Sequence, residues 1–122
     1  MDVLIVDDDP AVRKAFQRAL ERSGYMVQAV DNGLAAFAEL QQHQYRAIIL
    51  DIGMPFLKGD NLYGELASTL PDMARRVIFV TGWAARDDIK TFLEESGRPF
   101  LAKPVDFKTL VATVRRVAEG SG

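Results

Sequence analysis

Apolar residues follow two alternating patterns along the chain. Short, nearly continuous apolar runs occupy residues 3–6, 26–30, 47–50, 77–80 and 100–102. Runs of this length between turn residues are typical of strands, whereas apolar residues three and four positions apart indicate amphipathic helices. The helical spacing occupies residues 10–23, 34–43, 59–70, 87–95 and 107–117. The pattern therefore predicts five strands that alternate with five helices.

This alternation predicts a mostly parallel α/β sheet with helices on both faces. The runs VLIV (3–6), AIIL (47–50) and VIFV (77–80) are wholly apolar, as central strands are. MVQAV (26–30) is partly polar and FLA (100–102) is short, so both suit the edges. Right-handed crossovers then favour the strand order 2-1-3-4-5, which opens a crevice between the first and third strands.

Residues that start or stop helices separate these elements. Asp9 is placed to cap the first helix with Pro10 at its first position, and Asp106 is placed to cap the last helix. Gly24 marks the end of the first helix. Pro71 is expected to close the third helix.

The stretch AIILDIGMP, residues 47–55, joins the most central strand to a carboxylate. Gly53 and Pro55 end the apolar run at once, so Asp51 is expected at the carboxyl end of that strand. Open α/β sheets bind ligands at this end of their strands. Taken by itself, Asp51 fits an aspartate that caps a loop better than a functional one, and the rest of the chain reverses that preference.

Four of the five predicted strands end in side chains that can do chemistry. These are Asp7 and Asp8, Asp51, Thr81 and Lys103. Parallel strands place these ends on one edge of the sheet, where three carboxylates would repel one another unless a cation lies between them. Mg²⁺ prefers such oxygen ligands, so the sequence predicts a magnesium site at this edge.

Each of these features also has a purely structural interpretation. The acidic run 7–9 fits a solvated helix cap, Thr81 a plain strand exit, and Lys103 a surface lysine. His43 is the only histidine and is interpreted as a surface residue. Phe56 and Trp83 are either exposed aromatics or contacts for a partner.

Composition narrows the possible classes of protein. The 122 residues are 48% apolar and 26% charged, which fits one folded domain, expected over residues 1–119 with a disordered tail at 120–122. A net charge of −2 gives no electrostatic reason to expect nucleic acid or membrane binding. There is no cysteine, and no apolar run approaches the roughly 20 residues of a membrane span. A cytoplasmic protein is therefore expected.

Four motifs together resemble those of a known family. VDDD at 6–9, LDIGMP at 50–55, VTG at 80–82 and KP at 103–104 occur in the order and spacing of the response-regulator receiver domains of two-component signalling. The resemblance covers residues 3–117 and implies a flavodoxin-like fold. It identifies the chain as similar to a phosphotransfer domain rather than to a turnover enzyme.

The resemblance also implies a chemical role for the strand-end residues. Asp51 would accept a phosphoryl group from the phosphohistidine of a sensor histidine kinase or a histidine phosphotransfer protein. Asp8 and Asp51 would bind Mg²⁺ directly with the backbone carbonyl of Gly53, and Asp7 would act largely through water. Lys103 would pair with the phosphoryl group.

The family further implies a switch that uses Thr81 and Phe100. Thr81 would move toward the phosphoryl group and Phe100 would turn inward, which would reshape the face formed by residues 87–95, 100–102 and 107–117. A downstream protein is expected to bind this face. The alternative is that the aromatic residues there only pack against the core. The bond between Lys103 and Pro104 is expected to be cis.

The connection between the fourth helix and the fifth strand departs from many receivers. Residues 96–100 form a segment about one residue shorter than in receivers with a DNA-binding output, and Pro99 stiffens it. This segment looks more like that of receivers attached to hybrid sensor kinases. Gly53 and Trp83 occupy positions that tune phosphate lifetime in the family, and the sequence leaves that lifetime open.

Two other functions are compatible with parts of the pattern. A receiver-like binding module that is never phosphorylated would have the same fold. A magnesium-dependent phosphatase of the haloacid dehalogenase type would carry a second aspartate where Gly53 stands, which argues against that class. After residue 117 no basic helix remains to enter a DNA groove, so output through protein contact is expected.

Overall fold

The computed structural model describes residues 1–52 and 58–120, with side chains from residue 62 onward in the second range. Its five strands form one parallel sheet in the order β2-β1-β3-β4-β5, as predicted. The strands are β1 Val3–Val6, β2 Val27–Val30, β3 Ala47–Asp51, β4 Val77–Thr81 and β5 Phe100–Ala102. Of the predicted tail at 120–122, residues 121–122 lie outside the described residues.

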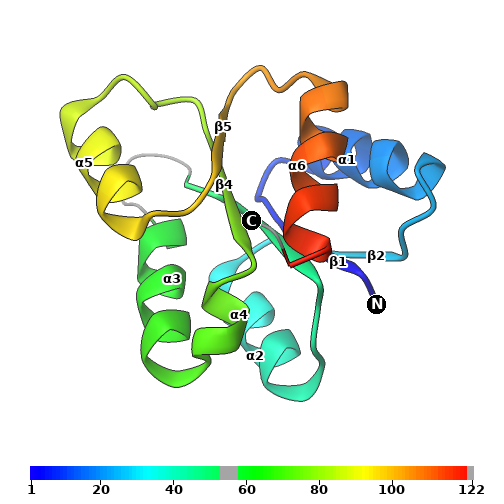
Figure 1. Cartoon of the computed structure of the whole chain (residues 1–122), viewed down its shortest axis with the longest axis horizontal. Coiled ribbons are helices and arrows are strands. Elements are labelled where there is room, and N and C mark those ends of the chain that lie inside the picture. The colour runs from blue at the N-terminus through cyan, green and yellow to red at the C-terminus, as the bar shows by residue number, and fades with distance from the viewer. Residues whose placement is uncertain (53–57, 121–122) are drawn as a thin grey trace.

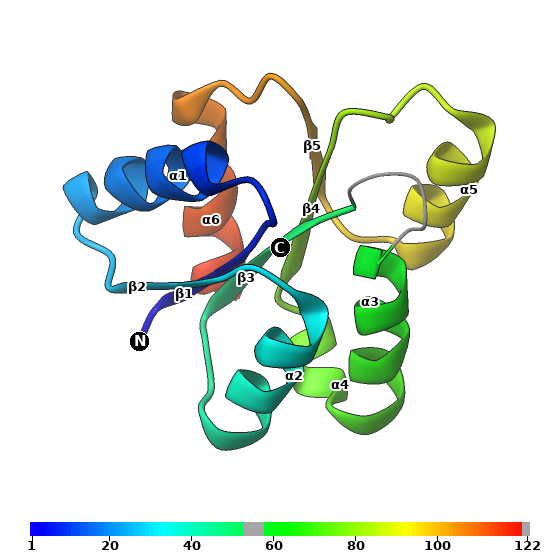
Figure 2. The ribbon, with the colours of Figure 1, turned by 180° about the vertical axis from the view of Figure 1, so that it is seen from behind.

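Helices cover both faces of this sheet. They are α1 Pro10–Arg22, α2 Gly33–Gln42, α3 Lys58–Thr69, α4 Pro71–Ala74, α5 Asp87–Ser96 and α6 Phe107–Ala118. Helices α1 and α6 lie on one face, and α2 to α5 lie on the other (Figures 1 and 2). Among the described residues no helix has the length and apolar character needed to cross a bilayer.

The described chain has six helices where the sequence predicted five. Helix α3 ends at Thr69, and Pro71 begins the additional one-turn helix α4 instead of only terminating α3. Proline suits this first helical position because its missing N–H would have no partner inside the helix. Met73 and Ala74 of α4 are buried in the core between the sheet and helices α2 to α5, so this turn covers that core between the end of α3 and the start of β4.

Neighbouring residues of the three central strands enter different cores. In β3, Ile48 and Leu50 pack with α2 to α5, whereas Ala47 and Ile49 pack with α1 and α6. This alternation follows from the two-residue repeat of a strand. Asp51 continues the row of Ala47 and Ile49 and therefore lies on the α1 and α6 side of the sheet end.

The helix caps form as expected from the sequence. The Asp9 carboxylate accepts hydrogen bonds from the backbone N–H groups of Ala11 and Val12, and Pro10 is the first residue of α1. Asp106 accepts from the N–H of Thr109 at the start of α6. These caps fix where β1 passes into α1 and where β5 passes into α6, beside the carboxyl ends of the strands.

Candidate functional site

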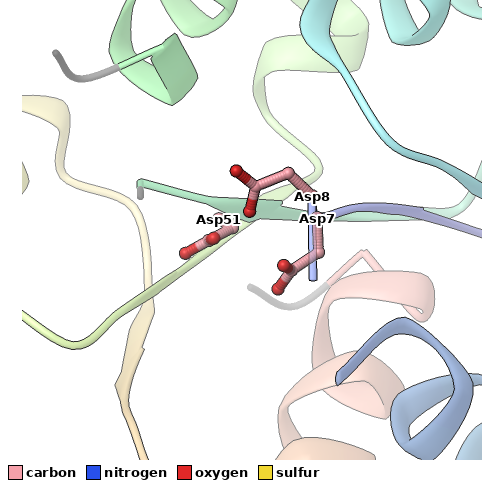
Figure 3. Close-up of side chains that lie close together, drawn as sticks. All are labelled: Asp7, Asp8 and Asp51. Atoms are coloured by element: carbon pink, nitrogen blue, oxygen red, sulfur yellow. The ribbon is translucent and has the colours of Figure 1, made fainter. Parts of the chain in front are cut away.

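Three carboxylates meet at the carboxyl end of the sheet. Strands β1 and β3 pair in register from Val3 opposite Ala47 to Val6 opposite Leu50, so the residues that follow reach the same edge. Figure 3 shows Asp7, Asp8 and Asp51 around one small space. One oxygen from each lies within 4.8 Å of the others. The predicted convergence of these three aspartates is therefore present.

The turn between β1 and α1 holds Asp7 through several hydrogen bonds. The N–H of Asp7 donates to the carbonyl of Val30 at 3.2 Å, and Asp7 Oδ1 accepts from the N–H of Asp9 at 2.9 Å. Arg13 Nη1 donates to the carbonyl of Asp7 at 2.8 Å. Asp7 is buried, whereas Asp8 is exposed. The two adjacent carboxylates therefore reach the site from the interior and from solvent.

Lys103 provides the positive charge at this site. Its Nζ lies 3.4 Å from Asp51 Oδ1 and 3.5 Å from Asp7 Oδ2. The backbone places it there because β4 and β5 pair and the N–H of Lys103 donates to the carbonyl of Thr81 at 2.8 Å. The cis bond to Pro104 that the resemblance implied is present. Lys103 thus joins two carboxylates that come from distant parts of the chain.

The surroundings of Asp51 raise its pKa. Burial, followed by the negative charge of Asp7, raises the pKa of Asp51 from 3.8 to about 6, although Lys103 opposes the shift. Burial alone would lower the pKa of Lys103, but attraction to Asp51 and Asp7 outweighs it and the net pKa is raised. Lys103 therefore stays protonated beside carboxylates that it does not fully neutralise.

One oxygen of Asp51 has no hydrogen bond of good geometry from the part of the chain that the structure describes. Asp51 Oδ1 is buried and finds no hydrogen-bond partner among the described residues, although the Lys103 ammonium is near it. Buried carboxylate oxygens are almost always hydrogen-bonded or bound to a cation. With the Lys103 ammonium at 3.4 Å and no well-aligned hydrogen bond from the described residues, this oxygen can still accept a further ligand.

Thr81 and the two aromatic residues predicted around it lie in different environments. Thr81 is fully buried at the end of β4, next to the end of β3, and its hydroxyl accepts a hydrogen bond from the N–H of Trp83 at 2.9 Å. Trp83 is 43% exposed and Phe100 is 47% exposed, so neither is simply a core residue. Phe100 pairs across from Phe79 on the edge strand β5.

The remaining predicted positions lie apart from this cluster or outside the described residues. His43 is exposed at the end of α2, toward the edge of the sheet where β3 begins. Gly53 and Phe56 fall outside the described residues. Arg13 was not recognised from the sequence, and its position four residues after the Asp9 cap was the only available signal.

Comparison with known proteins agrees with this geometry. A model of the response regulator receiver domain matches residues 3–115. The chain belongs to the response regulator receiver family. Membership removes the reason to consider a haloacid dehalogenase phosphatase and confirms the resemblance drawn from the four motifs.

The curated relatives of this receiver differ in length. The response regulator receiver protein CpdR of Brucella abortus is 30% identical over 119 residues, which cover 94% of each protein. The transcriptional regulatory protein CseB of Streptomyces coelicolor is 34% identical, over 98% of this chain and 50% of CseB. The sensor kinase CckA of Brucella abortus is 33% identical, over 96% of this chain and 12% of CckA. The receiver thus spans half or less of the length of two of these relatives.

Solved structures share the fold over nearly the whole chain. A CheY-like receiver domain from Methanospirillum hungatei superposes with a TM-score of 0.86 and 26% identity, covering 98% of this chain and 94% of that one. The receiver domain of a signal transduction histidine kinase from Syntrophus aciditrophicus gives a TM-score of 0.85 and 30% identity, covering 98% and 90%.

Proposed function

We propose that this receiver domain acts in the cytoplasm and accepts a phosphoryl group on Asp51. The donor is the phosphohistidine of a sensor histidine kinase or a histidine phosphotransfer protein. The observation that carries the proposal is the buried Asp51 oxygen, which among the described residues has the Lys103 ammonium close by but no hydrogen bond of good geometry, next to a second carboxylate. A nucleophile in such a place is pre-positioned and poorly neutralised, as phosphoryl acceptance requires.

The donor set at this edge fits Mg²⁺. Asp7, Asp8 and Asp51 each offer one carboxylate oxygen within a space of 4.8 Å, which is the hard-oxygen ligand type that Mg²⁺ selects. The Gly53 carbonyl that the resemblance adds lies outside the described residues. Bound Mg²⁺ would supply charge neutralisation for the phosphoryl oxygens.

The protein's own side chains account for the rest of the transfer. The ionised Asp51 carboxylate forms a bond to phosphorus while the bond from phosphorus to the imidazole nitrogen breaks, and the donor imidazole leaves. The Lys103 ammonium, already 3.4 Å from Asp51 Oδ1, stabilises the negative charge of the transferred group. The Thr81 hydroxyl lies at the adjacent strand end and accepts from the Trp83 N–H, so its own proton is available to donate to the phosphoryl group.

We infer that the output leaves through the face formed by α5, β5 and α6. Trp83 and Phe100 support this because both side chains are partly exposed. Trp83 directly follows β4, which ends at Thr81, and Phe100 lies on β5, which pairs with β4. A movement of Thr81 on phosphorylation would therefore first displace Trp83, whose N–H donates to the Thr81 hydroxyl. The partner at this face would be a protein.

Phosphorylation by a small donor tests the proposal. Acetyl phosphate with Mg²⁺ is expected to add one phosphoryl group to the wild-type chain, measured by intact mass, and none to the Asp51→Asn variant. Asp72→Asn is the matched control, since Asp72 is an exposed aspartate of α4. Equal modification of the wild type and Asp51→Asn would place the acceptor elsewhere. Absence of modification in the wild type would favour the non-phosphorylated binding module.

A further inference from the structure

We propose that Arg13 is a positioning residue for the metal-binding carboxylates. Its Nη1 donates to the backbone carbonyl of Asp7 at 2.8 Å, in a half-buried place on α1. Arg13 touches neither Asp8 nor Asp51 through any described hydrogen bond or ion pair, so it acts through the backbone of the turn. The inference rests on the proposed function, because it concerns how the same site binds Mg²⁺.

Arg13 holds both ends of the acidic turn. Its backbone N–H donates to the carbonyl of Asp9 at 3.0 Å, as the first full turn of α1 requires, while its side chain reaches back to the carbonyl of Asp7. The pairing of β1 with β3 ends one residue earlier, at Val6. The N–H of Asp7 still bonds to Val30 of β2, but its carbonyl accepts from Arg13, so the guanidinium bond fixes the orientation of the peptide group between Asp7 and Asp8.

The bond from Arg13 to the Asp7 carbonyl has its largest effect on the position of Asp8. Its carboxylate is exposed, and no described residue holds it by a hydrogen bond or an ion pair. The backbone of the turn therefore sets its direction toward Asp7 and Asp51. Arg13 fixes the peptide group that directly precedes Asp8. Loss of the Arg13 side chain would let this turn relax and would move the Asp8 oxygen away from the other two.

The charge of Arg13 works against its positioning role. A guanidinium close to a cation site repels Mg²⁺, so removing the charge alone would tighten Mg²⁺ binding. Loss of positioning would weaken Mg²⁺ binding, because residues that orient metal ligands typically change metal affinity by about 10–100-fold when substituted. The direction of the change in affinity therefore separates the two effects.

The experiment compares Arg13→Met and Arg13→Lys with the wild type and with Arg18→Met. Arg18 is exposed on the same helix, so the control removes the same charge and introduces the same side chain. The Mg²⁺ dissociation constant is obtained from the rise in melting temperature of the metal-free chain during a MgCl₂ titration. We expect Arg13→Met to weaken binding by about 10-fold, the low end of the range for orienting residues. Arg13→Lys should recover part of this loss, and Arg18→Met should stay within about twofold of the wild type.

A second readout separates positioning from general damage to the fold. The rate of Asp51 modification by acetyl phosphate should return close to the wild-type value in Arg13→Met once MgCl₂ is saturating, because only the metal affinity is affected. Unchanged or tighter Mg²⁺ binding in Arg13→Met overturns the inference, as does a rate that stays low at saturation. If the wild type itself shows neither a Mg²⁺-dependent melting shift nor modification, the proposed function fails first.

Discussion

Replacement of Asp51 by asparagine should stabilise the metal-free chain near neutral pH. The pKa of Asp51 is raised from 3.8 to about 6 because the carboxylate is buried next to Asp7 and only partly offset by Lys103. At 1.36 kcal/mol per pKa unit, this shift corresponds to about 3 kcal/mol of unfavourable ionisation. Solvent at the open edge of the site screens part of it, which leaves about 2 kcal/mol. Asparagine keeps the shape and removes the charge.

The stabilisation should depend on pH in a defined direction. Between pH 3.8 and about 6 the folded chain holds a proton on Asp51 that the unfolded chain has already lost. The contribution of Asp51 to the free energy of unfolding therefore falls as the pH rises through this window. In Asp51→Asn this contribution is absent. The difference between the variant and the wild type should be about 2 kcal/mol at pH 7.5 and only about 0.5 kcal/mol at pH 4.

Urea denaturation in EDTA at several pH values between 4 and 7.5 measures this difference. Glu94→Gln is the control, because it removes one negative charge from an exposed position on α5 and should change the free energy of unfolding by less than about 0.5 kcal/mol. An Asp51→Asn variant no more stable than the wild type at pH 7.5 would refute the reasoning. So would a variant that keeps the wild-type dependence on pH.

Two further predictions concern the metal and the output face. MgCl₂ should raise the melting temperature of the wild type but not of Asp8→Ala, because the variant lacks the exposed carboxylate of the site; a full shift in the variant would exclude Asp8 as a ligand. Beryllofluoride, which mimics the phosphoryl group, should change backbone NMR shifts at Asp51 and Thr81 and also at Phe100 and in α6. Changes that stop at Thr81 would contradict the proposed output face.

The sheet could be predicted from sequence because its central strands are buried on both faces. Val3–Val6 and Val77–Val80 are at most 5% exposed, and continuous apolar runs are the direct signature of such burial. Helix α4 was missed because Pro71 is compatible with both the end of one helix and the first residue of another. A one-turn helix is also too short to show a 3.6-residue repeat.

Which residues meet at the carboxyl end of the sheet could be predicted, but the hydrogen bonds between them could not. Parallel topology alone brings Asp7, Asp51 and Lys103 to one edge, so their spacing in the sequence was sufficient. Two contacts depend on side-chain directions, which have no sequence signature: the lack of a hydrogen bond to Asp51 Oδ1 from the described residues, and the bond from Arg13 to the Asp7 carbonyl. For the same reason the sequence left open whether Phe100 was packed or exposed, and the structure places it half in solvent.

The alternation of β3 between two cores has a consequence for changes in chain length. Ala47, Ile49 and Asp51 share one row, and Ile48 and Leu50 share the other. A single residue inserted into or deleted from this strand would exchange the rows beyond that point, turn the Asp51 carboxylate toward α2 to α5 and turn Ile52 toward Asp7 and Asp8. A one-residue insertion or deletion within β3 is therefore expected to damage the fold more than one in the connections between strands.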